Sequence, residues 1–403
     1  MTDASMTRPP PLTGRRVLDL SRVLAGPWCG QILADLGAEV IKVENPKGGD
    51  DTRAWGPPFA GGESAYYLSA NRGKRSIAVD LASAEGQAIV LELAARADIL
   101  IENYKLGGLD RFGLDYASVA KVNPRLIYCS ISGYGRTGPA AARLGYDYVI
   151  QAEGGLMAIT GETDGPPVRA GVAVADLFTG MAAAQACLAA LIAADRDGLG
   201  QHIDMALYDC QLAMLGNVAS DYLISGNEAK RHGNGHPTVV PYENLPTADG
   251  RVVIAVGNDR QFAALATLLG RADLAADDRF TKNAGRIVNR EALLVELKPL
   301  VAEHTTGWWL ENLPKTGIPG GEVTPVSRAV DSEVSHARGM VVEVPHPTAE
   351  TIRLMASPLK LSGTPVRAPQ TPPLLGQDSD AVLAELGYDE ARIERLRASG
   401  AIA

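Results

Sequence analysis

The N-terminal third of the chain alternates short apolar runs with segments whose apolar positions recur every three to four residues. The runs at 16–21, 39–44, 76–81, 98–102 and 125–130 are short and predict β-strands. The periodic segments at 28–36, 85–96 and 116–122 predict helices between them. This repeated order of strand and helix is typical of an α/β domain, in which helices cover both faces of a parallel sheet. Ligands are then expected at the carboxyl ends of the strands.

The pattern changes beyond residue 200. A segment rich in Pro, Gly and His, HGNGHPTVVPYE at 232–243, precedes a predicted strand at 251–256 and a predicted helix at 260–269. The remainder predicts strands at 340–344 and 352–355, a proline-rich stretch and a closing amphipathic helix. We therefore expect a small α/β domain over 225–325, between an N-terminal part, 1–224, and a C-terminal part, 326–403.

Composition excludes several classes of protein. The 403 residues carry 38 Lys and Arg against 47 Asp and Glu, so a net charge of -9 argues against a nucleic-acid partner. The alanine-rich run at 181–194 predicts a buried helix, and no run reaches the roughly 18 apolar residues of a membrane span. The four cysteines are far apart, and no histidine pairs with a cysteine or an acid at metal-ligand spacing. With an N-terminal start that lacks the apolar core of a signal peptide, these features predict a cytoplasmic protein without a metal.

A glycine motif and a basic cluster are the first candidates for chemistry. GYGRTG at 133–138 fits the GxGxxG pattern of nicotinamide-dependent enzymes, but the residues after it do not open a regular helix. The alternative is a structural loop in which glycines let the backbone approach a ligand or a neighbouring strand. Arg72, Lys74 and Arg75 form either a solvated face or, together with Arg22 and Arg111, a site for a polyphosphate.

Asp176 is the third candidate, because it lies at or near the start of the long helix that contains 181–194. The common role for such a residue is to cap the helix by accepting backbone N–H bonds, worth about 1 kcal/mol. The alternative is a nucleophile that the helix dipole keeps ionised at neutral pH and that attacks an activated acyl group. Spacing alone favours the capping role.

The order of several segments resembles one family over nearly the whole chain. VLDLSRVLAGPWCGQILADLGAEVIKVENP is followed by GDDTRAWGPPF, NRGKRSIAVDL, ADILIENY, GLDRFGLDY, IYCSISGYGRTGP, PVRAGVAVADLFTG and PPLLGQ. As an ordered set, these segments resemble the class III CoA-transferases, and most of all their succinyl-CoA:glutarate branch. The resemblance implies a Rossmann-like large domain built from both chain ends, a smaller domain, and an interlocked homodimer.

The resemblance also implies a mechanism. Asp176 would be the nucleophile that forms an anhydride with the acyl group of an acyl-CoA and then an aspartyl-CoA thioester. Coenzyme A thioesters and a carboxylic acid are then substrates, and no permanently bound cofactor is needed. The positions that match the family's CoA contacts are Arg22, Ala25, Val79, Asp80, Leu81, Asn103, Tyr104, Lys105 and Arg111. The positions expected near the acyl group are Trp55 and Tyr146, with His236 in the segment 232–243.

Two departures from the family pattern bear on the substrate. Asn45 stands where formyl-CoA transferase has an arginine for the nucleotide end of CoA, and Lys47 is a nearby substitute. The tetraglycine loop of that enzyme is replaced by HGNGHPTVVPYE, which favours an acid larger than formate or oxalate. We therefore expect succinyl-CoA as donor and a dicarboxylate such as glutarate as acceptor.

Other functions remain open at this point. The same fold carries α-methylacyl-CoA racemases, but Tyr146 stands where those enzymes have a catalytic histidine, which disfavours proton transfer. A nicotinamide enzyme that uses GYGRTG and a protein that only binds acyl-CoA are the remaining alternatives.

Overall fold

The chain forms two structural units. The computed structural model describes residues 8–403; the first seven residues of the predicted N-terminal start lie outside this range. Unit 1 contains the described residues up to Leu156, together with Ala170–Ser220 and Glu333–Ala403. Unit 2 contains Met157–Arg169 and Asp221–Ser332. Both chain ends therefore contribute to unit 1.

The segment 157–169 corrects the predicted domain boundaries, which placed it in the N-terminal part of the large domain. Arg231 explains the difference. Its guanidinium donates hydrogen bonds to the carbonyl oxygens of Ala158, Glu162 and Gly165, at 3.2, 3.2 and 2.9 Å. These bonds hold the segment within unit 2, although its own sequence carries no sign of that attachment.

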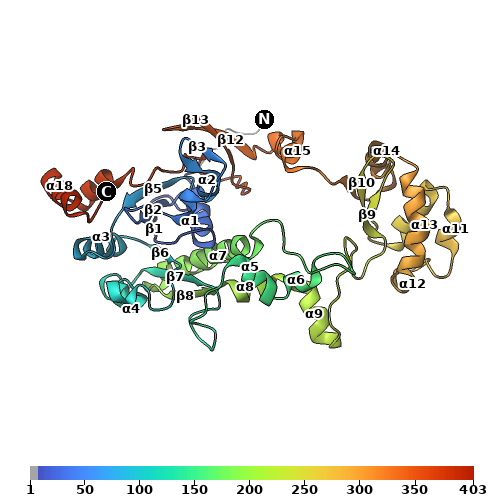
Figure 1. Ribbon diagram of the computed structural model, residues 1–403, viewed down its shortest axis with the longest axis horizontal. Helices are drawn as coiled ribbons and strands as arrows, with labels where there is room; N and C mark the ends of the chain where they lie inside the picture. The colour runs from blue at the N-terminus through green and yellow to red at the C-terminus, as the bar shows by residue number, and fades with distance from the viewer. Residues whose placement is uncertain (1–7) are drawn as a thin grey trace. The chain divides into compact units, whose positions relative to one another are not determined.

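Unit 1 contains a six-stranded parallel sheet (Figure 1). Its strands are β1 (Arg16–Asp19), β2 (Glu39–Glu44), β5 (Lys74–Ala78), β6 (Ile99–Glu102), β7 (Ile127–Ser132) and β8 (His202–Ala206). They lie in the order β5-β2-β1-β6-β7-β8, so the direction of winding reverses between β1 and β6. This is the order of a doubly wound Rossmann-like sheet, whose ligands bind where the winding reverses. The predicted parallel α/β sheet is confirmed, and β8 is a strand that the sequence did not reveal.

Helices cover both faces of this sheet. The helices of unit 1 are α1 (Ala25–Asp35), α2 (Ala65–Ala70), α3 (Ala84–Ala95), α4 (Tyr116–Val122), α5 (Asp147–Glu153), α7 (Val174–Asp197), α8 (Leu207–Met214), α16 (Glu333–Ala337), α17 (Ser379–Leu386) and α18 (Glu390–Ser399). Successive residues of a strand point to opposite faces. Thus Leu18 and Leu100 join a core with α3, α4, α17 and α18, whereas Val17 and Ile99 join one with α1 and α7.

Short hairpins complete unit 1. They pair β3 (Phe59–Ala60) with β4 (Glu63–Ser64), and β12 (Val341–His346) with β13 (Glu350–Met355). The closing amphipathic helix predicted from the sequence is two helices, α17 and α18, because Gly387 ends the first in a left-handed conformation.

Helix α7 is longer than the predicted run and only partly buried. Ala183, Cys187 and Ala190 lie in the core, whereas Met181 and Ile192 are exposed. By length and composition, contrary to expectation, α7 is the one helix among the described residues that could cross a membrane. The core helices of water-soluble proteins have the same properties, and the buried side of α7 packs in the core beside the sheet.

Unit 2 has its own core. Its antiparallel sheet has the order β11-β10-β9, with β9 (Tyr242–Pro246), β10 (Arg251–Ala255) and β11 (Gly320–Glu322). Its helices are α10 (Asp259–Leu268), α11 (Ala272–Ala276), α12 (Asn283–Val288), α13 (Arg290–Ala302), α14 (Thr306–Asn312) and α15 (Val326–Val330). The helices α6 (Leu156–Ile159) and α9 (Gly216–Ser225) connect it with unit 1. Phe262, Phe280 and Trp309 fill the centre of this core.

Candidate active site

A cleft of about 300 Å³ opens at the carboxyl ends of the sheet strands in unit 1. The loops after β1, β2, β5 and β6 contribute its walls, so it lies where the winding of the sheet reverses. Its lining includes the predicted positions Arg22, Val79, Asp80, Leu81, Tyr104 and Arg111, together with Asn45 and Lys47. Arg22, Lys47 and Arg111 are exposed cations, which suit a polyanionic ligand.

The loop after β1 is held in an unusual conformation beside this cleft. The side chain of Asn103 accepts a hydrogen bond from the Arg22 N–H at 2.9 Å and donates one to the Arg22 carbonyl at 2.7 Å. The next residue, Val23, has φ of 72°, a left-handed conformation that costs a β-branched residue about 1–3 kcal/mol. Its N–H donates to the carboxylate of Asp50 at 3.2 Å. Asn103 therefore acts on the cleft through the backbone of Arg22, and Asp50 is a supporting residue that the sequence did not reveal.

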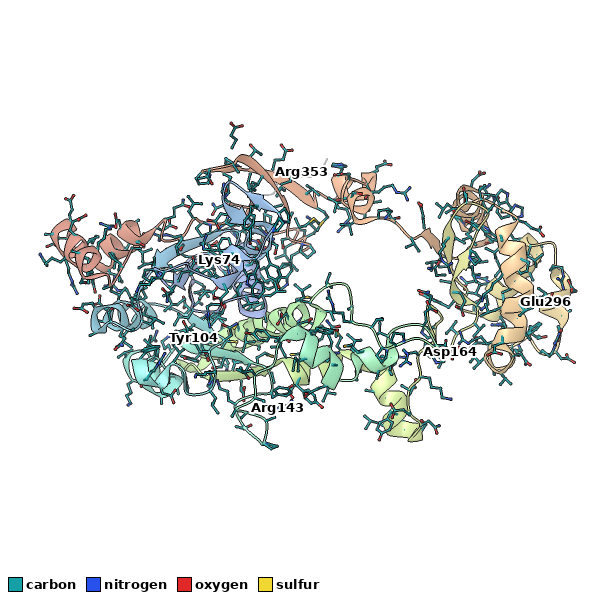
Figure 2. All side chains as sticks on the ribbon, in the orientation of Figure 1. Lys74, Tyr104, Arg143, Asp164, Glu296 and Arg353 are labelled. Atoms are coloured by element: carbon teal, nitrogen blue, oxygen red, sulfur yellow. The ribbon has the colours of Figure 1, made fainter. Side chains whose placement is uncertain are left out.

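The basic cluster NRGKRS does not line this cleft and two of its cations, Arg72 and Lys74, are buried, so neither of the two alternatives, a solvated face or a polyphosphate site, describes it. Lys74 is fully buried and pairs with Asp19 at 2.8 Å (Figure 2 labels Lys74). Arg72 pairs with Asp35 at 2.5 Å, and Arg75 is held by Glu39 and Glu385. Each of the three cations therefore has an acid partner on a neighbouring element, and the pairs of Arg72 and Lys74 are buried.

Helix α7 receives its N-terminal cap from another helix, so Asp176 does not cap it. Asp176 is the third residue of α7, and the residue before the helix, Ala173, has no capping side chain. The carboxylate of Asp147, the first residue of α5, accepts a hydrogen bond from the Ala175 N–H at 2.8 Å and a longer one from the Asp176 N–H at 3.4 Å. Gln151 donates to the other oxygen of Asp147 at 2.7 Å. The carboxylate of Asp176 is thereby left for another role.

The protonation of Asp176 differs from the sequence expectation. The pKa of this carboxyl is raised from 3.8 to about 7, mainly by burial and secondly by the nearby charge of Asp147. The helix dipole favours an ionised carboxylate, but it does not outweigh the loss of hydration and the second carboxylate. Asp176 is therefore poised between its two protonation states near neutral pH, which suits a group that must gain and lose a bond.

Two aromatic residues lie close to this carboxyl. The pKa of Tyr66 is raised to about 12, first by burial and then by the charges of Asp176 and Asp147. Its phenol therefore stays neutral and can donate a hydrogen bond to a charged oxygen. Trp55 packs edge-on against Tyr66, with 5.3 Å between ring centroids. The structure thus brings the predicted Trp55 toward Asp176 through Tyr66, which the sequence did not single out.

The start of α1 lies against the same part of α7. A Cβ at Gly180, one turn after Asp176, would lie 2.6 Å from the carbonyl oxygen of Ala25. A side chain at this position would push the two helices apart. Ala25 itself is buried and does not line the cleft. Ala25 therefore lies at the contact between α7 and the start of α1, just after the loop that carries Arg22.

Three of the predicted site residues do not line the cleft. Tyr146 is exposed and immediately precedes Asp147. Lys105 is exposed and does not line the cleft. His236 belongs to unit 2, where its ring contacts Tyr242 and its carbonyl accepts a hydrogen bond from Arg290 at 2.5 Å. Tyr146 therefore lies next to the carboxylate that caps α7, and Lys105 lies outside the lining of the cleft.

The GYGRTG segment is a structural loop. It follows β7, but α5 begins only at Asp147, so the motif does not open a helix as a dinucleotide site requires. A Cβ at Gly133 would lie 2.7 Å from the Cα of Gly145, so the two backbones touch. This contact fixes the position of Gly145, two residues before Asp147. No group of three or more possible metal ligands occurs within residues 8–403.

The fold and the site together define an α/β protein with a cleft that exposed cations line at the edge of a doubly wound sheet, and with a carboxyl of raised pKa in helix α7. Residues 12–379 match CoA-transferase family III. The chain is 49% identical over 396 residues to a succinate–glutarate CoA-transferase of Agrobacterium fabrum, which covers 96% of this chain and 98% of that protein. It is 44% identical over 394 residues to a human succinyl-CoA:glutarate CoA-transferase, with coverages of 97% and 90%.

A solved structure agrees with these matches. The CAIB/BAIF family protein from Brucella suis superposes with a TM-score of 0.85 at 47% identity, covering 94% of this chain and all of that one. The chain therefore belongs to CoA-transferase family III, and it is a CoA-transferase. The family resemblance found in the sequence is confirmed.

Proposed function

We propose that this enzyme transfers CoA from succinyl-CoA to a dicarboxylic acid such as glutarate, through a covalent intermediate on Asp176. The observation that carries the proposal is the Asp176 carboxyl, which has a pKa of about 7 and lies in the first turn of α7. The similarity of 44–49% identity to succinate–glutarate CoA-transferases supports these two acids. The CoA moiety is assigned to the cleft that contains Arg22 and Arg111, whose guanidinium groups would bind its phosphates.

The reaction begins when the ionised Asp176 attacks the thioester carbon of succinyl-CoA. A C–O bond forms and the C–S bond breaks, giving a mixed anhydride and CoA thiolate. The thiolate then attacks the Asp176 carbonyl carbon, which forms aspartyl-CoA and releases succinate. The carboxylate of the acceptor attacks aspartyl-CoA and expels the thiolate again. Finally, the thiolate attacks the acceptor carbonyl of the second anhydride, which gives the new acyl-CoA and frees Asp176.

The surroundings of Asp176 fit these steps. Asp147 fixes the first turn of α7 through the Ala175 N–H, so the attacking carboxylate is oriented by the backbone. Each step passes through a negatively charged tetrahedral oxygen, and the neutral phenol of Tyr66 is a suitable donor to it. No step consumes a proton or an electron, so coenzyme A thioesters and carboxylic acids suffice as reactants.

Trapping the intermediate tests the proposal. We expect incubation with succinyl-CoA, followed by rapid denaturation and peptide mass analysis, to reveal CoA on the peptide that contains Asp176. Asp176→Asn should lose this adduct and the exchange activity while it keeps its fold, and Asp197→Asn at the far end of the same helix is the matched control. Full exchange by Asp176→Asn would refute the assignment. A panel of mono- and dicarboxylic acids offered with succinyl-CoA then identifies the acceptor.

We further propose that the enzyme works as an interlocked homodimer. Several large apolar side chains are exposed on helices of both units, among them Met181 and Ile192 on α7 and Leu223 and Ile224 on α9. Apolar exposure on this scale is typical of a surface that a partner covers. Light scattering should give twice the chain mass at all dilutions, and two differently tagged preparations should not exchange subunits when mixed. A monomer, or rapid exchange, would contradict the interlocked arrangement.

A further inference from the structure

The arginine of GYGRTG makes contacts that the transfer mechanism does not use. Arg136 lies in the loop after β7, and its backbone N–H donates to both carboxylate oxygens of Asp204 on β8, at 2.9 and 3.1 Å. Its guanidinium reaches across β7 to the carboxylate of Glu102, the last residue of β6. Glu102 pairs in register with Ser130 on β7, which pairs with Asp204 on β8. One residue therefore links the carboxyl ends of three adjacent strands.

Glu102 in turn holds the edge of the cleft. Its side chain is fully buried, and one carboxylate oxygen accepts a hydrogen bond from the Tyr104 N–H at 2.7 Å. Tyr104 lines the cleft, and the guanidinium of Arg22 lies over its ring, 5.5 Å from the centroid. Asn103, between Glu102 and Tyr104, makes the paired hydrogen bonds to the backbone of Arg22. The orientation of this loop therefore depends on the position of the Glu102 carboxylate.

The charge of Arg136 keeps the Glu102 carboxylate ionised, so that it can accept the hydrogen bond from the Tyr104 N–H. Burial raises the pKa of Glu102, and the charge of Arg136 opposes this rise more than any other group. Without the guanidinium, a fully buried carboxylate would lose its ion partner, which favours the protonated form. A protonated carboxyl is a weaker acceptor for the Tyr104 N–H. The loop after β6 would then lose the bond that fixes it.

We propose that Arg136 and Glu102 form a positioning pair that holds the CoA-binding loop 103–105 against Arg22. The inference rests on the proposed placement of CoA in this cleft. The GYGRTG motif, which contains Arg136, would then contribute to substrate binding although it is not a dinucleotide site. Because the contacts of Glu102 lead to the CoA cleft through Tyr104, loss of the pair should affect the acyl-CoA substrate and leave the carboxylic acid substrate unaffected.

Steady-state kinetics on the full-length enzyme separate these effects. For Arg136→Met we expect the KM for succinyl-CoA to rise about tenfold or more, the fold-change of one lost charge-assisted hydrogen bond, with kcat and the KM for the acid nearly unchanged. Arg136→Lys keeps the charge and should recover most of the affinity. Arg143→Met is the matched control, because Arg143 (Figure 2) is an exposed arginine of the same loop and pairs with Glu153.

A third variant distinguishes failure of the inference from failure of the cleft assignment. Arg111→Met removes a cation that lines the cleft directly, so it should also raise the KM for succinyl-CoA. An unchanged KM in Arg136→Met, alongside a raised KM in Arg111→Met, would refute the positioning pair alone. An unchanged KM in both would refute the cleft assignment and the inference with it. A third outcome would also refute the inference by showing a merely structural role. In that outcome kcat falls, the KM values for both substrates rise, the melting temperature is lower, and Arg136→Lys recovers none of these properties.

Discussion

Replacement of Asp147 by Asn tests whether this neighbour sets the reactivity of Asp176. The substitution removes a negative charge and keeps an oxygen that can accept the Ala175 N–H, which Asp147 now binds at 2.8 Å. It also places an amide group against the Gln151 side chain. In the wild type, that side chain donates a hydrogen bond to the second carboxylate oxygen of Asp147 at 2.7 Å. Gln151 can turn its amide to restore that bond, at the expense of its bond with the Ala170 N–H. We therefore expect a folded variant with a loss of stability of about 1 kcal/mol.

The pKa of Asp176 should fall in this variant. Burial is the larger cause of its rise to about 7, and the charge of Asp147 is the second. Two unit charges about 6 Å apart repel by roughly 3 kcal/mol at an effective dielectric constant of about 20, and water at a half-buried site reduces this further. We expect a shift of about one unit downward, since one unit is worth about 1.4 kcal/mol. Burial should keep the pKa above its ordinary value.

The pH dependence of kcat/KM measures this shift, because it reports on groups of the free enzyme. Wild-type activity should rise with pH and level off above about 7, as Asp176 becomes ionised. With a pKa about one unit lower, Asp147→Asn should be about fivefold more active relative to its own plateau at pH 6 than wild type. Asp197→Asn, at the other end of α7, should keep the wild-type profile. An unshifted profile, or one shifted upward, would refute the coupling between Asp147 and Asp176.

The free energy of unfolding should also depend on pH through Asp176. The folded pKa of Asp176 lies above the ordinary value of 3.8, so the folded chain binds more protons than the unfolded chain between about pH 4 and 7. The contribution of this group to stability therefore decreases as pH rises through that window. Asp147→Asn should lessen the decrease, which denaturant titrations at several pH values would detect.

Three further substitutions test the rest of the fold. Lys74→Met leaves the fully buried carboxylate of Asp19 without its cation and should cost about 3–5 kcal/mol, measured by denaturant unfolding against Lys121→Met. Gly133→Ala forces a methyl group against the backbone of Gly145 and should lower the melting temperature and the activity together, whereas Gly138→Ala, where a Cβ meets nothing, tests the effect of its left-handed backbone alone. Arg231→Met removes three hydrogen bonds to carbonyl oxygens and should speed hydrogen exchange in the loop that they hold, without a matching change in the rest of unit 2.

The parallel sheet could be predicted because its strands are buried on both faces and appear as continuous apolar runs. Strand β8, with the sequence HIDMA, mixes polar and apolar positions because it lies at the edge of the sheet, and it carries no such signal. The rule that ligands bind at strand carboxyl ends led to Arg22 and Arg111 as candidates, whereas Tyr104 was predicted only from the family resemblance. The attachment of residues 157–169 to unit 2 depends on Arg231, which lies far along the chain, and periodicity cannot reveal it.

The charged residues show where sequence reasoning fails at the site. The sequence left Arg72, Lys74 and Arg75 as either a solvated face or a phosphate site, but each has an acid partner that only the packed fold brings near. Asp176 was found by its place in a helix and by resemblance. Its raised pKa depends on burial and on Asp147, 29 positions earlier in the chain, so no local pattern contains it.

In the proposed mechanism, the raised pKa of Asp176 would also affect the direction in which each anhydride breaks. A carboxylate of higher basicity is a better nucleophile and a poorer leaving group. When CoA thiolate meets the anhydride between Asp176 and an ordinary carboxylic acid, attack at the Asp176 carbonyl expels the more acidic partner. Formation of aspartyl-CoA is therefore favoured, and the released acid can leave before the acceptor enters. In the proposed mechanism, burial and Asp147 would thus do more than activate the nucleophile: they would also stabilise the covalent state in which one acid is exchanged for another.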